Sequence, residues 1–487
     1  MKVKPLNENC LNGILEYLSD DKITLYSCMY ANRFFCKIVV PILWRNPWIN
    51  SSIRYDDTIF WKTIGKTIIK CLPNESKELL FKKGLRLNPS VIGPPLFNYI
   101  SYCQSLSSRI IRKLTDNMLD GYNTNNTSND HRTLIQEEFW KLFLKQSYSI
   151  KFLKLPTFKI FEYPGAKNSL KFLSTLDCDT FLTSEYFLEI QKYCHFIRRI
   201  EIVMNFNNYN EEIESLILTQ KNLQELKFIA IDEKKLFKFK KEETIKFLSH
   251  SLKSIEFENR VCLSPHIFPS FNNLTELHIN LKNFDYIGLY CLKDIIIPQL
   301  EVLNFKNAVG VNFDIYSTFI SNTQGFLRII KIETKSHPPI SNIEIYLQTL
   351  TTYCPRIEFV PIWLARRQSL DVFDSFLFSS SELKVIQIEL KEPNDLHLNK
   401  EPALARPILE LLATRSSPEL RKIYLKGKWS FSHIDLRGFF EMWKGRRRLL
   451  TFNLDNDFYS YYIVQVCKEY YKQGVINGGT INYTSKA

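Results

Sequence analysis

The sequence predicts an α/β solenoid, built from short strands that alternate with helices, behind a separate helical unit at the N-terminus. Three observations predict it: an apolar pattern that recurs from residue 150 to residue 454, helical segments between its copies, and apolar residues at helical spacing within the first fifty residues. An apolar content of 45%, with 14% aromatic residues, is enough to fill buried cores, so the composition excludes a wholly disordered chain.

Charge and glycine content limit the kinds of partner. The formal net charge of +13 over 487 residues is modest, and it indicates solubility or an acidic partner more than nucleic-acid binding. Glycine accounts for 15 residues, about 3% of the chain against a typical ~7%. This scarcity counts against folds that bind phosphate through glycine-rich loops.

The sequence also predicts where the protein works. No stretch approaches the ~18 apolar residues that a membrane helix requires. Asn7, Glu8 and Glu16 stand where a signal peptide needs an apolar stretch. The 11 cysteines include no C-x-x-C pair, which indicates neither a disulfide framework nor a zinc module. We therefore expect a protein of the cytoplasm, the nucleus or both, with no membrane partner.

Signals of catalysis are missing from the sequence. It contains no G-x-x-x-x-G-K-[ST], G-x-G-x-x-G, H-E-x-x-H or G-x-S-x-G motif. Cys194 and His195 are adjacent, and neighbours in a chain seldom face each other as nucleophile and base, so we interpret them as a helix end packed on the core. The acidic pair around Cys178 has no partner ligands at a plausible spacing. We expect no catalytic site, no metal and no cofactor, which favours a binding function.

The first fifty residues predict three short helices. Residues 7–18 carry apolar side chains at helical spacing behind Asn7, a suitable N-cap. A second helix follows over residues 23–29, and a third over residues 34–40, interrupted by Pro41. Three helices in so short a segment leave little room for a core of their own. We therefore expect a partner to complete part of the apolar surface.

This N-terminal segment, residues 1–49, resembles an F-box. The residues that carry the resemblance are Leu6, Leu11, Ile14, Tyr17-Leu18, Leu25, Cys28, Asn32-Arg33, Phe35, Cys36 and Pro41-Ile42-Leu43-Trp44. The segment departs from the family pattern at Asn7, Asn9 and Phe35, where proline, glutamate and tryptophan are usual. The resemblance implies a surface for the Skp adaptor, formed or supported by Leu6, Leu11, Ile14, Leu18, Leu25, Cys28 and Trp44.

The solenoid is predicted from the recurring triplet L-x-x-L-x-L. Its copies are Ile150-Leu153-Leu155, Ile197-Ile200-Ile202, Leu223-Leu226-Phe228, Leu252-Ile255-Phe257, Leu274-Leu277-Ile279, Leu300-Leu303-Phe305, Leu327-Ile330-Ile332, Ile357-Val360-Ile362, Leu383-Ile386-Ile388, Leu420-Ile423-Leu425 and Leu449-Phe452-Leu454, with a weaker member at Leu170-Leu173-Thr175. The mean spacing of the first positions is about 27 residues, within the range of leucine-rich repeats.

Helical segments fill the intervals, among them residues 211–218, 242–248, 343–350, 407–412 and 436–443. We therefore predict a degenerate leucine-rich-repeat array of about twelve strand–helix units over residues 146–476, whose apolar positions share one continuous core. A capping helix is expected over residues 458–474, and residues 477–487 are expected to be frayed.

Residues 50–145 are predicted to be a helical spacer. Its expected helices cover residues 61–70, 76–81, 96–106 and 137–144, and residues 120–131 form a polar, low-complexity segment expected to be a mobile loop. We expect this spacer to join the F-box to the solenoid and to cap its first turn.

An F-box followed by leucine-rich repeats resembles the substrate receptors of Skp–cullin–F-box ubiquitin ligases. The resemblance implies three partners: the Skp adaptor, a cullin-RING ligase bound through it, and a protein substrate that the sequence does not identify. The substrate would bind the strand face of the solenoid. There the early repeats carry Lys151, Lys154, Lys171, Arg198 and Arg199, a basic patch suited to an acidic or phosphorylated segment.

Other readings of the sequence stay open. The basic patch has an alternative interpretation as an ordinary solvated face. The protein as a whole could be a leucine-rich-repeat scaffold whose N-terminal helices do not bind the adaptor. A third, weaker hypothesis is nucleic-acid binding through residues 234–241 and 446–448, although Glu233, Glu242 and Glu243 dilute the first of these runs and neither resembles a reading module.

Overall fold

The computed structural model describes residues 7–48, 58–85, 93–119, 129–204, 211–231, 242–261, 263–280, 291–307, 313–334, 338–365, 369–390, 404–427, 429, 431–446, 448–455 and 461–477. The chain divides into two compact units, Met1–Leu223 and Gln224–Ala487. In the described part of the chain, no helix combines the length and the apolar character needed to cross a membrane.

The first unit begins with three short helices, α1 (Glu8–Tyr17), α2 (Lys22–Ala31) and α3 (Arg33–Leu43). Each starts at a side chain that accepts a hydrogen bond from an otherwise unpaired backbone N–H: Asn7 from Asn9, Asp21 from Thr24 and Asn32 from Phe35, with distances of 3.3, 3.0 and 2.9 Å. The N-cap role predicted for Asn7 is confirmed.

The third helix runs through Pro41, so the interruption predicted there is wrong. Proline removes only its own N–H from the helical hydrogen bonds. The pattern resumes at once, because the backbone N–H of Trp44 donates to the carbonyl of Val40 at 3.0 Å.

Five further helices follow in the first unit: α4 (Thr58–Cys71), α5 (Asn74–Lys82), α6 (Tyr99–Tyr102), α7 (Ser108–Leu119) and α8 (Asn129–Gln146). The helix expected over residues 96–106 is wrong for most of its length, because α6 has only four residues and is followed by the strand β1 (Ser105–Ser107). That strand pairs in parallel with β2 (Phe152–Lys154), so the sheet begins within the segment predicted as an all-helical spacer.

The loop predicted over residues 120–131 is only partly covered by the structure. Asn129, Asp130 and His131 belong to the first turn of α8, where the negative charge of Asp130 is favourable beside the positive end of the helix dipole. That part of the loop prediction is therefore wrong, and residues 120–128 lie outside the described residues.

The repeats of the first unit place β1, β2, β3 (Thr175–Asp179) and β4 (Arg199–Met204) side by side in chain order, all parallel. Three helices, α9 (Ala166–Ser169), α10 (Ser184–Tyr193) and α11 (Glu212–Thr219), alternate with them. Leu153, Leu176 and Ile200 are paired neighbours on successive strands and are fully buried. The register fixes these aliphatic side chains as one column of the core.

This register corrects the weak triplet Leu170-Leu173-Thr175 that was predicted from the sequence. Leu176 and Cys178 are buried in β3, whereas Thr175 is only half-buried. The repeat is therefore Leu173-Leu176-Cys178, with cysteine as a small apolar residue in the third position.

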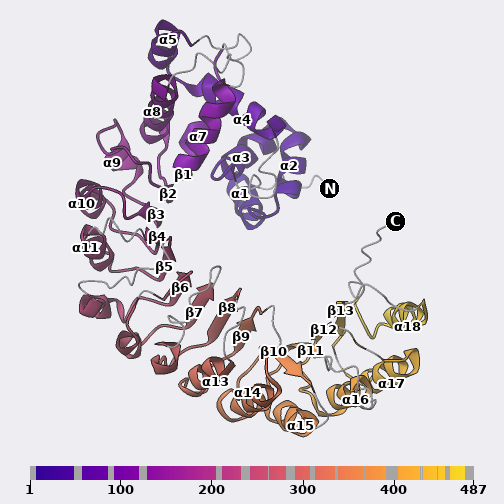
Figure 1. Ribbon diagram of the computed structural model, residues 1–487. Helices are drawn as coiled ribbons and strands as arrows, with labels where there is room; N and C mark the ends of the chain where they lie inside the picture. Colours follow the sequence, from indigo (N-terminus) through magenta and orange to yellow (C-terminus); the bar gives the residue numbers. More distant parts are fainter. Residues whose placement is uncertain are drawn as a thin grey trace. The chain divides into compact units, whose positions relative to one another are not determined.

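The second unit continues the strand–helix alternation from β5 to β13. Its strands are β5 (Glu225–Ala230), β6 (Ser254–Glu258), β7 (Glu276–Asn280), β8 (Val302–Lys306), β9 (Ile329–Ile332), β10 (Phe359–Leu364), β11 (Val385–Leu390), β12 (Lys422–Lys426) and β13 (Thr451–Asp455), each parallel to the next. The connecting segments are 3-10 helices first, η4 (Glu242–Leu248), η5 (Pro265–Ser270) and η6 (Cys291–Asp294), and then α13 (Phe313–Ser321), α14 (Ile340–Tyr353), α15 (Ser369–Ser379), α16 (Ala405–Arg415), α17 (His433–Trp443) and α18 (Tyr461–Lys472). Within this unit the helices α13 to α18 lie on one side of the strands (Figure 1).

The predicted repeat pattern is confirmed in the described strands. The second and third apolar positions of the eleven stronger triplets are buried, and between β5 and β6 the rings of Phe228 and Phe257 stack with centroids 5.6 Å apart. Only the first position of the last repeat differs from the prediction: Leu449 is 50% exposed, whereas Leu450 is 0% exposed and takes the first core position.

Short asparagine contacts also join repeats in the second unit. Asn259 and Asn307 both have a positive φ directly after a strand, a conformation that asparagine tolerates better than most residues. The Asn259 side chain donates to the carbonyl of Ala230 at 2.6 Å, and the Asn307 side chain donates to Asn280 Oδ1 at 2.7 Å. Each of these contacts joins the turn after one strand to the end of the preceding strand.

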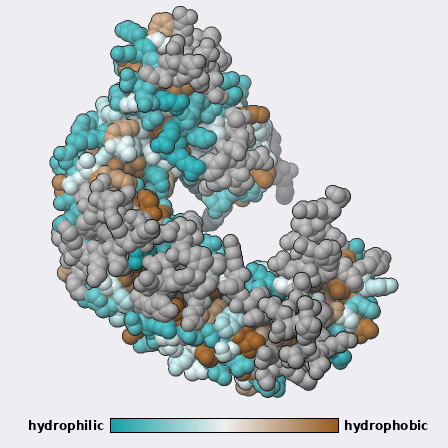
Figure 2. All heavy atoms as spheres, viewed as in Figure 1, coloured by the Kyte–Doolittle hydropathy of each residue, from teal (hydrophilic) through white to brown (hydrophobic). Residues whose placement is uncertain are grey.

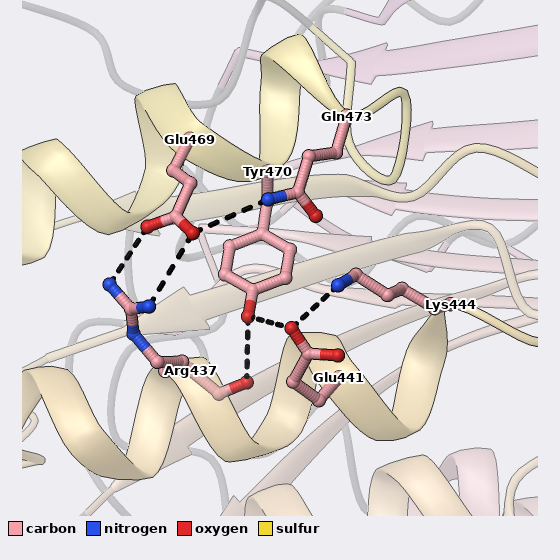
Figure 3. Close-up of polar contacts among 6 residues, drawn as sticks. All are labelled: Arg437, Glu441, Lys444, Glu469, Tyr470 and Gln473. Atoms are coloured by element: carbon pink, nitrogen blue, oxygen red, sulfur yellow. Dashed lines mark hydrogen bonds and ion pairs between the residues drawn. The ribbon is translucent and has the colours of Figure 1, made fainter.

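The C-terminal helix α18 packs on α17 through a group of polar contacts (Figure 3). Arg437 pairs with Glu469 at 2.8 Å, and the hydroxyl of Tyr470 donates to Glu441 at 2.5 Å. Lys444 pairs with the same Glu441 carboxylate at 2.6 Å. The expected capping helix is thus helical from Tyr461 to Lys472 and is attached to the last repeat.

The tail predicted to fray from residue 477 begins later than expected. The N–H of Asn477 donates to the carbonyl of Leu450 at 2.9 Å, and Ile476 forms a parallel bridge with Leu450. Asn477 is therefore tied to the last repeat, and residues 478–487 lie outside the described residues.

Gly165, at the start of α9, offers a test of the close packing between helices in the first unit. Its φ is +85°, and a Cβ there would lie 2.5 Å from the carbonyl oxygen of Leu144 at the end of α8. Gly84 has the same φ with nothing within 4 Å. We expect Gly84→Ala to cost about 1–2 kcal/mol of unfolding free energy from backbone strain. Gly165→Ala should cost about 1–3 kcal/mol more, because the backbone around Leu144 must move to make room for the added Cβ. Equal shifts in urea denaturation would contradict this.

Candidate functional site

The N-terminal helices enclose a small core, and two of the predicted adaptor residues belong to it. Leu11 and Leu25 are buried together with Leu15 of α1 and with Ile38, Val39, Ile42 and Leu43 of α3. These two leucines hold the bundle together and cannot contact a partner directly. Their role at the predicted surface is support.

The other predicted adaptor residues lie at different depths. Leu18, Cys28 and Trp44 are half-buried against the same core, whereas Ile14 is about half exposed. Leu6 lies outside the described residues. The structure thus separates residues that the sequence pattern could only group, and Ile14 is the most accessible of the six that are described.

A stripe of exposed apolar residues on α2 was missed by the sequence analysis. Ile23 and Tyr30 are 82% and 81% exposed, and Tyr26, between them, is also exposed. These three residues, at positions i, i+3 and i+7, share one face of the helix, which we call the α2 stripe. Leu25 points to the opposite side, into the bundle core. Tyr17 of α1 and Phe34 of α3 are exposed as well.

The signal for this stripe was present in the composition of α2. Its apolar residues are distributed around the whole helix instead of lying on one side. Such a distribution is typical of a helix that is buried on all sides. On the face shown in Figure 2, hydrophobic residues reach the surface as separate patches among hydrophilic ones. Single exposed apolar residues are ordinary, but an apolar stripe along a helix that already fills a core on its other side indicates a contact surface.

The bundle is attached to the rest of the first unit by polar and aromatic contacts. Arg45, two residues after α3, is itself held to α1, because its guanidinium forms two hydrogen bonds with the carboxylate of Glu16, each 2.5 Å long. The buried Trp48 donates from Nε1 to the carbonyl of Ser105 at 2.8 Å. Its ring also stacks on Trp61. The hydrogen bonds from Arg45 hold the pKa of Glu16 below its usual value.

Backbone hydrogen bonds continue from the bundle into the sheet. The carbonyl of Arg45 accepts from the N–H of Gln104 at 2.8 Å, and the carbonyl of Gln104 accepts from Lys151 at 2.8 Å. Lys151 accepts in turn from Ser174 at 2.9 Å, and Ser174 from Arg198 at 2.8 Å. We call this series the edge relay. It fixes the bundle to the residues that directly precede β2, β3 and β4. We call the line of residues just before each strand the leading edge of the sheet.

The five residues of the predicted basic patch divide into two groups. Lys154 and Arg199 are half-buried on the strands, and Lys154 Nζ lies 3.8 Å from a carboxylate oxygen of Asp177, its paired neighbour on β3. Lys151, Lys171 and Arg198 are exposed at the leading edge. The carboxylate of Asp177 therefore offsets part of the positive charge of the patch. The exposed cations lie beside the edge relay.

In the second unit, charged residues at the leading edge pair with one another. Glu301, Arg328, Glu358 and Lys384, from successive repeats, alternate in sign, with nitrogen–oxygen distances of 3.1, 2.5 and 2.8 Å. The pKa of Glu358 is lowered, chiefly by the hydrogen bond from Lys384. This ionic row connects repeats and leaves little net charge for a ligand.

The cysteines singled out in the sequence are buried. Cys194 ends α10, its thiol donates to the carbonyl of Leu170, and burial raises its pKa to about 12. The prediction of a helix end packed on the core is confirmed for Cys194, whereas His195 is exposed. Cys178 is buried in β3, where burial raises its pKa strongly. Within the described ranges, no cluster of three or more His, Cys, Asp or Glu residues is arranged to bind a metal ion.

Comparison with known proteins identifies no family. No protein-family model matches the chain, and no curated protein matches it. Among solved structures, a chain in the crystal structure of the Rad7 and Elc1 complex in yeast aligns with 88% of this chain and 96% of its own length. The sequence identity is 13% and the TM-score is 0.34. A likeness of this size assigns no function.

The pair of Glu16 and Arg45 predicts a pH-dependent stabilisation of the N-terminal helices. Because the folded-state pKa of Glu16 lies below its ordinary value, the pair stabilises at neutral pH, and this stabilisation is lost as the pH falls through the lowered pKa. Both side chains are more than a third exposed, so the coupling should stay below about 1 kcal/mol.

A double-mutant cycle of Glu16→Gln and Arg45→Met, measured by urea denaturation at pH 7 and again below pH 4, tests this dependence. The coupling energy should shrink toward zero at the lower pH. A coupling energy that is the same at both values would show that the charge of Glu16 contributes nothing.

Proposed function

We propose that this protein is a substrate-recognition subunit of a Skp–cullin–F-box ubiquitin ligase. In this proposal the bundle of α1 to α3 binds the Skp adaptor and the repeats bind a target protein. The observation that carries it is the α2 stripe. One side of α2 fills the core of the bundle, and the other side exposes Ile23, Tyr26 and Tyr30, an apolar surface suited to burial against another polypeptide.

The proposed role requires no bond chemistry in this chain. A receptor of this kind holds its target near a ubiquitin-loaded enzyme and thereby raises the effective concentration of the target. The edge relay supports such a role, because a bundle fixed to the sheet keeps the two binding surfaces of the first unit at a constant separation. The same proposal assigns the protein to the cytoplasm or nucleus, as a non-catalytic subunit without a cofactor.

The departures from the F-box pattern have structural counterparts here. Asn7 replaces the usual proline and caps α1 through its side chain. Phe35, in place of tryptophan, packs against the bundle core. Both residues therefore support the fold of the bundle, and the leucine-rich-repeat scaffold without an adaptor remains the second candidate, to be decided by the binding experiment.

The proposal predicts that charge on the α2 stripe abolishes adaptor binding. We expect the double variant Ile23→Asp/Tyr30→Asp to bind purified Skp adaptor at least about tenfold more weakly than the wild type, because interface energy concentrates in a few apolar and aromatic anchors. Titration calorimetry or a quantitative pulldown measures the change. Leu18 is less suitable, since it is half-buried and a charge there would also weaken the bundle.

A matched control is the double variant Phe81→Asp/Phe247→Asp, which places the same charges at exposed phenylalanines outside the bundle. It should bind the adaptor as the wild type does. If the wild-type protein itself retains no adaptor, or if the stripe variant binds undiminished, the ligase proposal is wrong and the scaffold reading takes its place.

The structure bears on the nucleic-acid hypothesis through the second basic run. The guanidinium of Arg446 donates to the carbonyls of Ala413 and Ser417, each at 2.9 Å, and lies over the ring of Trp443. Arg448 pairs with Glu419 at 2.9 Å. These two arginines are engaged within the repeats, which disfavours a phosphate-binding role for them. Residues 232–241, which include the first run, lie outside the described residues.

A further inference from the structure

Two phenylalanines in consecutive repeats of the first unit are exposed next to each other. Phe172 and Phe196 are 48% and 52% exposed, and their ring centroids lie 6.2 Å apart. Each directly precedes a fully buried core residue, Leu173 or Ile197, so the two rings occupy equivalent places in their repeats. The pair presents a continuous aromatic surface at the leading edge of β3 and β4.

The repeat fold itself does not require aromatic residues at this place. The equivalent residues in the next repeats are Asn222, Ser251 and Asn273, which are polar. A third phenylalanine, Phe326, also occupies it, but the guanidinium of Arg356 lies 5.1 Å from its ring centroid and Phe326 is less exposed than either of the other two. Phe172 and Phe196 are thus large apolar side chains that neither the core nor the repeat pattern explains.

Positive charge surrounds the two rings. Lys171 Nζ lies 4.8 Å from the centroid of Phe172, and Lys151 and Arg198 are exposed on either side of Ser174 in the edge relay. Among the described residues, neither Lys171 nor Arg198 forms an ion pair with a carboxylate. By contrast, Lys154, deeper in the sheet, faces Asp177. Lys171 and Arg198 therefore lie at the edge without a compensating carboxylate in the described part of the chain, whereas Lys151 is within electrostatic reach of Glu16.

We propose that Phe172 and Phe196, together with Lys151, Lys171 and Arg198, form a docking surface for an extended acidic peptide segment that carries one aromatic or leucine side chain. This aromatic–basic edge is the place where the target of the proposed receptor would bind, so the inference rests on the proposed function. The apolar side chain of the segment covers the two rings, and its carboxylates pair with the three cations.

The surrounding charges favour a peptide over a nucleic acid. Asp177, Asp179 and Glu201 face outward on β3 and β4 in the rows next to the edge. A nucleic acid carries a phosphate at every nucleotide and would meet these carboxylates, whereas a peptide can place its few acidic residues against the cations alone.

Selection from a random twelve-residue peptide library displayed on phage tests the proposal. The bait is the full chain, with counter-selection against the double variant Phe172→Ser/Phe196→Ser. Both phenylalanines are half-exposed, so the variant should keep the wild-type melting temperature, which is checked first. We expect the enriched peptides to combine net negative charge with an aromatic residue or leucine.

Synthetic versions of the enriched peptides should bind the wild type at least tenfold more tightly than either Phe172→Ser/Phe196→Ser or Lys171→Glu/Arg198→Glu, as measured by fluorescence anisotropy. The control variant Phe247→Ser/Phe378→Ser, at two other exposed phenylalanines, should bind as the wild type does. Enrichment of no peptides, or of peptides without acidic residues, would overturn the proposal. The proposal would also be overturned if a single-stranded nucleic acid of twelve nucleotides bound the wild type as tightly as the peptides do and the same variants abolished that binding.

The adaptor experiment separates this inference from the proposed function. The variants of the aromatic–basic edge leave the α2 stripe intact and should retain the adaptor in full. If peptides are selected but no adaptor binds, the docking surface stands and the ligase assignment fails. If the adaptor binds but no peptide is selected, the ligase assignment stands and the docking surface is wrong.

Discussion

The structure depends on the columns of aliphatic side chains beneath the parallel strands. A strand–helix unit cannot bury its apolar face alone, and it becomes stable only against the next unit in the same register. Leu153, Leu176 and Ile200 in one unit, and Leu226, Ile255 and Leu277 in the other, form such columns. Because the core fixes this register, the outward positions are also aligned. The exposed cations and rings of the leading edge are thus brought together by a constraint that originates in the core.

The sequence alone was sufficient for the repeats because their signal is periodic and local. A buried position every two residues within a strand, repeated at about 27 residues, leaves few alternative folds. The sequence was insufficient where the structure depends on one to three residues that form no repeating pattern. The strand at 105–107 is too short for a pattern and is held by its pairing with β2. Leu449 and Leu450 are both leucines, and only packing decides which of them faces the core.

The candidate site shows a different limit of sequence reasoning. Motif positions in the N-terminal segment combine residues that hold the helices together with residues that face outward, and the pattern does not distinguish them. Leu25 is buried, whereas Ile23, two residues earlier on the opposite side of the same helix, is almost fully accessible. Likewise, five basic residues near the first strands formed one predicted patch. The register divides them, since Lys154 is paired across the sheet with Asp177 and Arg198 is at its edge. Three-dimensional neighbours decide whether a charge is available.

The bridge between Leu450 and Ile476 has a consequence for how the protein behaves at high concentration. A parallel sheet ends in a strand whose outer N–H and C=O groups can recruit a strand from another molecule, and such end-to-end addition leads to fibres. Here the polypeptide returns after α18 and pairs its own backbone with Leu450, the residue directly before β13, while Arg437 and Tyr470 hold that helix in place. A chain cut short before Tyr461 would leave the backbone groups of Leu450 open to another polypeptide.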